Sequence, residues 1–131
     1  MRFVVVDASA LAALAFGEPE ADTVRDRLEG TVLFAPTLLK FELANTAWKK
    51  IRKSPGDADA ILGRLETTLN GDWGITWRDV DHVDAAVIAR GLDISAYDAS
   101  YVWLAGSLGA DLVTLDQKLI DVTKQFAAQT V

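Results

Sequence analysis

The chain has 131 residues, half of them hydrophobic, and no cysteine. This length and composition fit a single compact domain, residues 1–131, and exclude a disordered chain, disulfides, thiolate metal sites and cysteine nucleophiles. The formal net charge is −6, which by itself argues against nucleic-acid binding because a negative surface repels phosphates.

The N-terminal segment is too short in apolar residues to be a signal peptide, since Asp7 interrupts the run that ends at Val6. No segment approaches the ~18 consecutive apolar residues that a membrane helix needs. We therefore expect a cytoplasmic protein with no membrane partner.

The first expected strand is Phe3–Val6, a continuous β-branched apolar run typical of a strand buried on both faces. A similar apolar run returns at 32–35. Between the two strands we expect a helix over 8–16 ended by Gly17, and a second helix that begins at Glu18 and continues to about Glu29.

The remainder of the chain continues the alternation of helices and short strands. Glycine or a Ser-Pro-Gly turn separates most of these segments. The expected elements are a long helix 38–53, a helix 57–69, a strand 75–77, a helix 80–90 stopped by Gly91, a helix 96–108 stopped by Gly109, a strand 112–115 and a last helix of about 117–128. Such alternation predicts an α/β fold with a parallel sheet covered on both faces.

Four acids fall where such a sheet would form a site, at the carboxyl ends of its strands. Asp7 directly follows the first strand and Asp116 the last. Glu42 lies in the first turns of the long helix, and Asp98 near the start of the helix 96–108. Oxygen ligands of this kind suit Mg²⁺ or Mn²⁺, which can activate a water and stabilise charge on a scissile phosphate.

A structural interpretation of the same acids stays open. Aspartate after a strand commonly caps the next helix by accepting backbone N–H bonds, and Asp7 and Asp116 both precede helices. Glu42 and Asp98 are harder to explain as caps, because each lies among apolar neighbours and a buried carboxylate without a partner is costly.

Local sequence adds a resemblance that spans almost the whole chain. Its motifs, in chain order, are Val5-Val6-Asp7-Ala8-Ser9-Ala10-Leu11, Glu18-Pro19-Glu20-Ala21, Glu42-Leu43-Ala44-Asn45, Tyr97-Asp98-Ala99-Ser100-Tyr101 and Leu112-Val113-Thr114-Leu115-Asp116. In this order and spacing they resemble PIN-domain proteins, especially the VapC toxins. The resemblance implies a three-layer α/β/α sandwich with a central, mainly parallel sheet of four or five strands.

The resemblance also implies a function: hydrolysis of RNA by an endoribonuclease toxin, usually a homodimer, held inactive by a cognate antitoxin. Asp7, Glu42, Asp98 and Asp116 would bind one or two Mg²⁺ or Mn²⁺ ions. Ser9 and Thr114 would supply orienting hydroxyls, and Asn45 would hold Glu42 or the first strand. One feature departs from the family: the segment 123–131 lacks the glycine that typically precedes a final strand, which leaves the strand count open.

Basic residues gather on the helix that carries Glu42. Lys49 and Lys53 lie seven and eleven residues after Glu42 and so share its face to within ~20°. This stripe is a candidate path for an RNA backbone. Cations near a helix C-terminus also simply favour the helix dipole, and the sequence does not separate the two explanations.

Other classes fit less well. A dehalogenase-like phosphatase needs a second Asp where Ser9 stands, a receiver domain needs an acceptor Asp after Ala35, and no glycine-rich phosphate loop is present. A non-catalytic PIN-like scaffold remains the alternative. His82 and Lys118 are expected on the surface, Trp103 in the core, and Trp48 in a packing or partner contact.

Overall fold

A computed structural model describes the backbone of residues 1–130 and the side chains of residues 1–71 and 73–126. Its centre is a four-stranded sheet in the order β3-β2-β1-β4, in which every neighbouring pair is parallel. The strands are β1 (Arg2–Val6), β2 (Thr31–Pro36), β3 (Thr76–Arg78) and β4 (Asp111–Val113). The parallel sheet expected from the buried apolar runs is confirmed.

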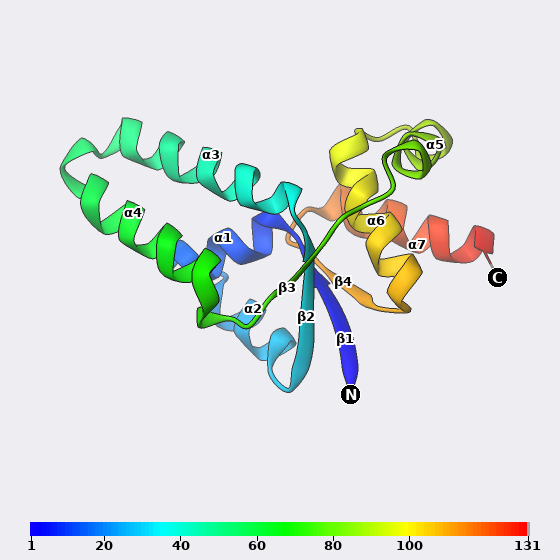
Figure 1. Cartoon of the computed structure of the whole chain (residues 1–131), viewed down its shortest axis with the longest axis horizontal. Coiled ribbons are helices and arrows are strands. Elements are labelled where there is room, and N and C mark those ends of the chain that lie inside the picture. The colour runs from blue at the N-terminus through cyan, green and yellow to red at the C-terminus, as the bar shows by residue number, and fades with distance from the viewer. Residues whose placement is uncertain (131) are drawn as a thin grey trace.

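Helices cover both faces of this sheet, which gives the three-layer α/β/α arrangement that the sequence predicted. In Figure 1, α1–α4 lie on one side of the strands and α5–α7 on the other. Their bounds are α1 (Ala8–Phe16), α2 (Ala21–Leu28), α3 (Leu38–Lys53), α4 (Ala58–Thr67), α5 (His82–Leu92), α6 (Ala96–Leu108) and α7 (Gln117–Thr130). A short 3-10 turn, η1 (Pro55–Asp57), joins α3 to α4, and a π-turn, η2 (Thr68–Asp72), follows α4.

Two helix boundaries differ from expectation. The helix expected to stop at Gly91 continues through it as α5 and ends at Asp93, which adopts a left-handed backbone with φ 54°. Residues 18–20 form a turn, and α2 begins only at Ala21. At both places the residue type predicted a helix boundary, but the hydrogen-bonded helix continues past Gly91 in one case and begins only after Glu20 in the other.

The C-terminal end of the sheet agrees with the glycine missing from the segment 123–131, which left a final strand in question. Within residues 1–130, no strand follows β4, and α7 occupies the C-terminal segment instead. No helix of the described part is long and apolar enough to span a bilayer.

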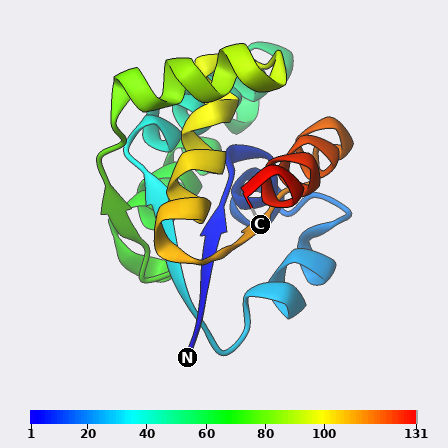
Figure 2. The same ribbon diagram turned by 90° about the vertical axis from the view of Figure 1, so that its right-hand side faces the viewer.

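The core lies where the sheet meets its helices. Val4, Val5 and Val6 of β1 are completely buried, as are Leu39 and Leu43 of α3. Helix α6 packs directly on β1, β2 and β4, and α5 and α7 pack against α6. Figure 2 shows α6 in front of the strands and α5 across the end at which the strands finish. Burial of the central strand thus holds the strand ends in fixed positions.

Candidate metal centre

Asp7 directly follows β1 at the carboxyl edge of the sheet, where the chain order reverses: β1 has β2 on one side and β4 on the other. Its side chain is only 5% exposed. Oδ1 accepts the Ala10 amide at 3.0 Å, so Asp7 caps α1, and the same oxygen accepts the Ser9 hydroxyl at 2.7 Å. The capping role and a place in the acidic site therefore coexist.

Thr114 joins the ends of β1 and β4. Its hydroxyl donates to Oδ2 of Asp7 and accepts the amide of Asp116 at 3.0 Å. The Ser9 hydroxyl lies 3.3 Å from that of Thr114 and accepts the Leu115 amide at 3.0 Å. The two hydroxyls named from the sequence do orient a carboxylate, namely that of Asp7.

Glu42 lies one turn into α3 and is half-buried. Its Oε1 accepts a hydrogen bond from the phenol of Tyr101, a residue of α6 that is 1% exposed. Burial, and after it the charge of Glu42, raises the pKa of Tyr101, so the phenol stays a donor. The sequence reasoning did not assign this role to Tyr101, although its position three residues after Asp98 on one helix face was a signal.

Asp98 and Asp116 occupy the starts of the last two helices. The Asp98 amide donates to the Ser95 hydroxyl at 3.0 Å, which leaves the half-buried Asp98 carboxylate out of the cap. Asp116 is exposed, and its Oδ1 accepts the Lys118 amide at 2.9 Å. Asp98 is therefore the member whose carboxylate makes no hydrogen bond to a described residue.

The four acids lie close enough to influence one another's ionisation. Burial raises the pKa of Asp7, Glu42 and Asp98 above their ordinary values. The charge of Asp116 raises the pKa of Asp7 and Asp98 further, and the charges of Asp98 and Asp7 do the same to Glu42. The nearby charge of Lys118 lowers the pKa of Asp98.

The donors present fit a hard divalent cation. They are carboxylate and hydroxyl oxygens, the ligands that Mg²⁺ and Mn²⁺ prefer, and a cation would relieve the repulsion among the acids. Among the described residues, no group of three or more acids or histidines is close enough to enclose an ion by itself. Mg²⁺ usually binds through one or two carboxylates and retains several waters, so such a cage is not required.

Three other residues named from the sequence lie along α3 and outside this cluster. Asn45 is exposed and makes no hydrogen bond to a described residue, so the expectation that it holds Glu42 or β1 in place is wrong. Lys49 and Lys53 are exposed, whereas their neighbour Lys50 pairs with Glu18 at 3.1 Å. The ammonium groups of Lys49 and Lys53 make no ion pair with a described residue and can contact a ligand.

The surface assignments are mostly as expected. His82 and Lys118 are exposed. Trp48 is 55% exposed, with the Arg52 guanidinium 5.9 Å from its ring. Trp103, expected in the core, packs against it and is partly buried, because its indole N–H donates to Asp84 of α5 at 3.1 Å.

Comparisons with known proteins agree with this architecture. The PIN domain family profile matches residues 4–125. Ribonuclease VapC3 of Pyrobaculum aerophilum is 31% identical over 121 residues, which cover 90% of this chain and 92% of the relative. Exonuclease VapC9 of the same organism is 35% identical over 120 residues, which cover 92% of this chain and 85% of the relative.

Solved structures share the fold. The crystal structure of PAE2754 from Pyrobaculum aerophilum matches with a TM-score of 0.71 and 26% identity, covering 97% of this chain and 96% of the other. Mycobacterium tuberculosis VapC20, described as a sarcin-ricin loop cleaving toxin, matches with a TM-score of 0.65 and 16% identity, covering 91% of this chain and 94% of the other.

The profile match defines the class, and the parallel sheet with acids at its carboxyl edge agrees with it: the chain belongs to the PIN domain family. Within that family its two curated relatives are both VapC nucleases, so it is a PIN-domain protein of the VapC type.

Proposed function

We propose that this chain, as a single domain of residues 1–131, is an endoribonuclease toxin dependent on Mg²⁺ or Mn²⁺. The observation that carries the proposal is the cluster of mutually interacting acids at the switch point of the sheet. Family membership and the VapC relatives support a nuclease, and the name of one of them, Ribonuclease VapC3, supplies RNA as the substrate class.

Each acid has a part in this proposal. Asp7, Glu42, Asp98 and Asp116 would hold one or two divalent ions. When bound, such an ion supplies Lewis-acid chemistry: it lowers the pKa of a water and offsets charge on the scissile phosphate. Thr114 and Ser9 hold Asp7 in one orientation, and Tyr101 does the same for Glu42. Asn45, exposed on α3, is available to a substrate or to a partner.

The mode of cleavage is a separate question, because one relative is named a ribonuclease and the other an exonuclease. A circular RNA separates the two modes, since it has no end at which an exonuclease could start. We expect the purified chain to linearise circular RNA with Mg²⁺ or Mn²⁺, and to leave it intact with a chelator.

Asp98→Asn is the matched variant for that assay. It removes one charge without breaking a described side-chain hydrogen bond, so the fold should persist. We expect at least ~100-fold loss of cleavage. Asp59→Asn, an exposed acid at the start of α4, should cut like wild type. Metal-dependent degradation of linear RNA alone would contradict endonuclease activity, and no cleavage of any RNA by the folded protein would favour the non-catalytic scaffold.

Lys49 and Lys53 are proposed to contact the RNA backbone. Reversing both charges should weaken cleavage and flatten its salt dependence, because each phosphate contact releases counterions. The matched control reverses two exposed cations elsewhere, Arg90 on α5 and Lys124 on α7, so that the net charge changes by the same amount. Equal losses in the two variants would indicate a general charge effect and no defined RNA path.

The remaining assignments concern location and assembly. From the VapC relatives we propose a cognate antitoxin that covers the four acids, a homodimer and a cytoplasmic location. Light scattering on the purified chain, alone and with the product of a neighbouring small gene, tests both kinds of assembly.

A further inference from the structure

A cavity of about 470 Å³ lies at the starts of α3 and α6, the helices that carry Glu42 and Asp98, and none of the four acids lines it. Three segments form it: the turn from β2 into α3, the connection from β3 together with the first turn of α5, and the N-terminal part of α6. Its volume falls in the range of small-ligand sites. A hydrogen bond from the Thr37 amide to the Arg78 carbonyl, at 3.1 Å, ties the first two segments together.

The position of the cavity is set by the same helices that carry two of the acids. Leu38 lines it one turn before Glu42 on α3, and Tyr97 lines it directly before Asp98 on α6. A nucleotide whose phosphate lies at the acids would therefore have its base beside this cavity.

The lining combines carbon surfaces with a few polar groups. Pro36, Leu38 and Val80 supply apolar walls, and Tyr97, 64% exposed, supplies an aromatic face. Asp79 and His82, both exposed, also line the cavity, and the Asp79 side chain makes no hydrogen bond to a described residue. Apolar walls, a free aromatic face and an unused acceptor suit a flat heterocycle that carries an amino group.

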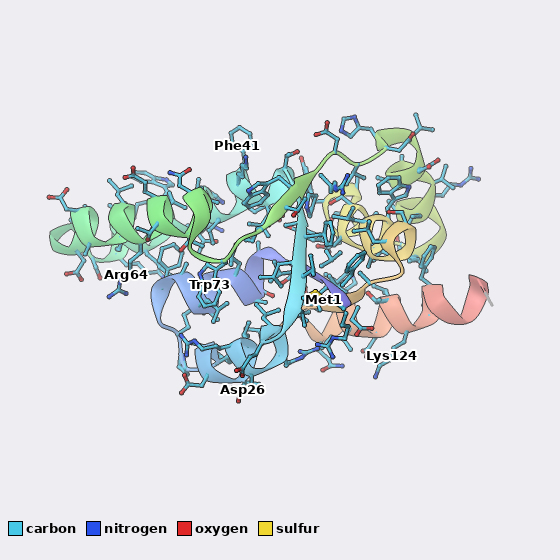
Figure 3. The ribbon with its side chains drawn as sticks, turned by 60° about the horizontal axis from the view of Figure 1, so that its bottom comes forward. Met1, Asp26, Phe41, Arg64, Trp73 and Lys124 are labelled. Carbon is cyan, nitrogen blue, oxygen red and sulfur yellow. The ribbon has the colours of Figure 1, made fainter. Side chains whose placement is uncertain are left out.

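Two cations lie near the turn at the cavity. Lys40, one turn after Thr37, lies with its ammonium 4.8 Å from the Trp77 ring, and Arg78, directly before Asp79, lies with its guanidinium 5.5 Å from the Phe34 ring. Phe41, 81% exposed, follows Lys40 in α3 and projects away from the ribbon into solvent, as Figure 3 shows. Cations and exposed aromatic rings together are the features by which proteins hold single-stranded nucleic acid.

From this arrangement we propose that the cavity is a base-binding pocket, in which an unpaired nucleobase next to the scissile phosphate stacks on Tyr97 and donates its amino group to Asp79. Adenine, cytosine and guanine carry such a donor and uracil does not. The pocket would restrict the nuclease to unpaired sites and favour amino-bearing bases. This inference rests on the proposed function, because it takes RNA as the substrate.

Binding of labelled RNA hexamers, followed by fluorescence anisotropy, tests the pocket. Asp116→Asn is the background, since it should block cleavage while its remaining oxygen can still accept the Lys118 amide. The probes are oligo-A, oligo-C, oligo-U and an abasic hexamer. Tyr97→Ala should weaken binding of oligo-A and oligo-C by roughly 5- to 150-fold, the range of one lost stacking contact, and leave the abasic hexamer unchanged. Tyr97→Phe, which keeps the ring, should bind like the background.

A second variant tests the acceptor. Asp79→Asn should reduce the preference for oligo-C over oligo-U by roughly fivefold or more, because an amide can donate as well as accept. Unchanged binding of every hexamer by Tyr97→Ala would overturn the pocket. So would an equal loss for the abasic hexamer, particularly with a change in mass by light scattering, which would identify this face as a contact between copies of the chain.

Cleavage of a long RNA by the wild-type chain reports on the nuclease independently. If metal-dependent cleavage occurs but neither variant changes base preference, the pocket is wrong and the nuclease stands. If the wild-type chain neither binds nor cuts any RNA, both proposals fail.

Discussion

Tyr101 fixes one oxygen of Glu42 from inside the core, and this contact joins α6 to α3. The phenol hydrogen bond lowers the pKa of Glu42 against the stronger effect of burial, which raises it. A carboxylate must lose its proton to bind a cation, so the phenol favours the binding-competent form.

Tyr101→Phe should therefore weaken Mg²⁺ binding about 10-fold or more, as loss of a residue that orients a metal ligand typically does. The acidic limb of the pH–rate profile should shift to higher pH, because Glu42 loses a bond that stabilises its charge. Calorimetric Mg²⁺ titration and the profile measure both effects. The control for metal binding is Tyr97→Phe, which removes an exposed phenol hydroxyl. Unchanged Mg²⁺ affinity in Tyr101→Phe would show that the hydrogen bond from Tyr101 to Glu42 is only structural.

Thr114 has a comparable role for Asp7, with the difference that its hydroxyl both donates and accepts. Thr114→Val keeps the shape and leaves the buried Asp7 oxygen and the Asp116 amide without this partner. We expect about 1–3 kcal/mol loss in the free energy of unfolding, measured with urea. Thr123→Val, which removes a hydroxyl bonded to the Leu119 carbonyl within α7, should cost less. Equal costs would deny a special role to the Asp7 network.

At the scale of elements, the helix ends depend on backbone conformation more than on residue type. Gly91 lies inside α5 with ordinary helical backbone and open space around it, whereas Gly109 ends α6 with φ 61°. The sequence predicted a stop at both glycines and was right only at Gly109. The difference is that α5 can continue to Asp93, which accepts the left-handed conformation.

The two glycines give opposite predictions. Gly91→Ala should stabilise the fold by about 0.5–1 kcal/mol, because alanine has the higher helix propensity. Gly109→Ala should destabilise it by about 1–2 kcal/mol, because a Cβ disfavours positive φ. Thermal unfolding of the two variants beside wild type measures both, and a shift of the same sign in each would contradict the assigned helix ends.

At the scale of the whole molecule, the acids at the carboxyl edge of the sheet make the free energy of unfolding depend on pH and on bound metal. The pKa values of Asp7, Glu42 and Asp98 are raised in the folded state, so the folded protein holds these protons more tightly than the unfolded chain does. Stability contributed by these groups is therefore lost as pH rises from the ordinary carboxyl value, about 4, through the raised values.

Without metal, we expect the melting temperature to fall between about pH 5 and about pH 8, and Mg²⁺ to raise it more at the higher pH, where protons no longer compete. Differential scanning fluorimetry with Mg²⁺ or a chelator measures this. Asp98→Asn should reduce both effects, and Asp59→Asn should not. A metal-free protein that becomes more stable towards pH 8 would contradict the raised pKa values.

The sequence by itself determined the alternation of strands and helices and the order in which the four acids follow one another along the chain. Buried β-branched runs such as Val4–Val6 that alternate with helices are typical of a parallel sheet. Acids that directly follow such runs lie at one edge of the sheet, so the positions of Asp7 and Asp116 were predictable from local pattern.

Only the tertiary structure decided which groups meet across those positions. Glu42 and Tyr101 are 59 residues apart, and Asp7 and Thr114 are 107 apart. No local pattern encodes their contact, because it depends on how α6 and β4 pack against β1. The cavity beside Tyr97 was hidden for the same reason: three segments distant in sequence line it, and packing alone leaves the space between them open.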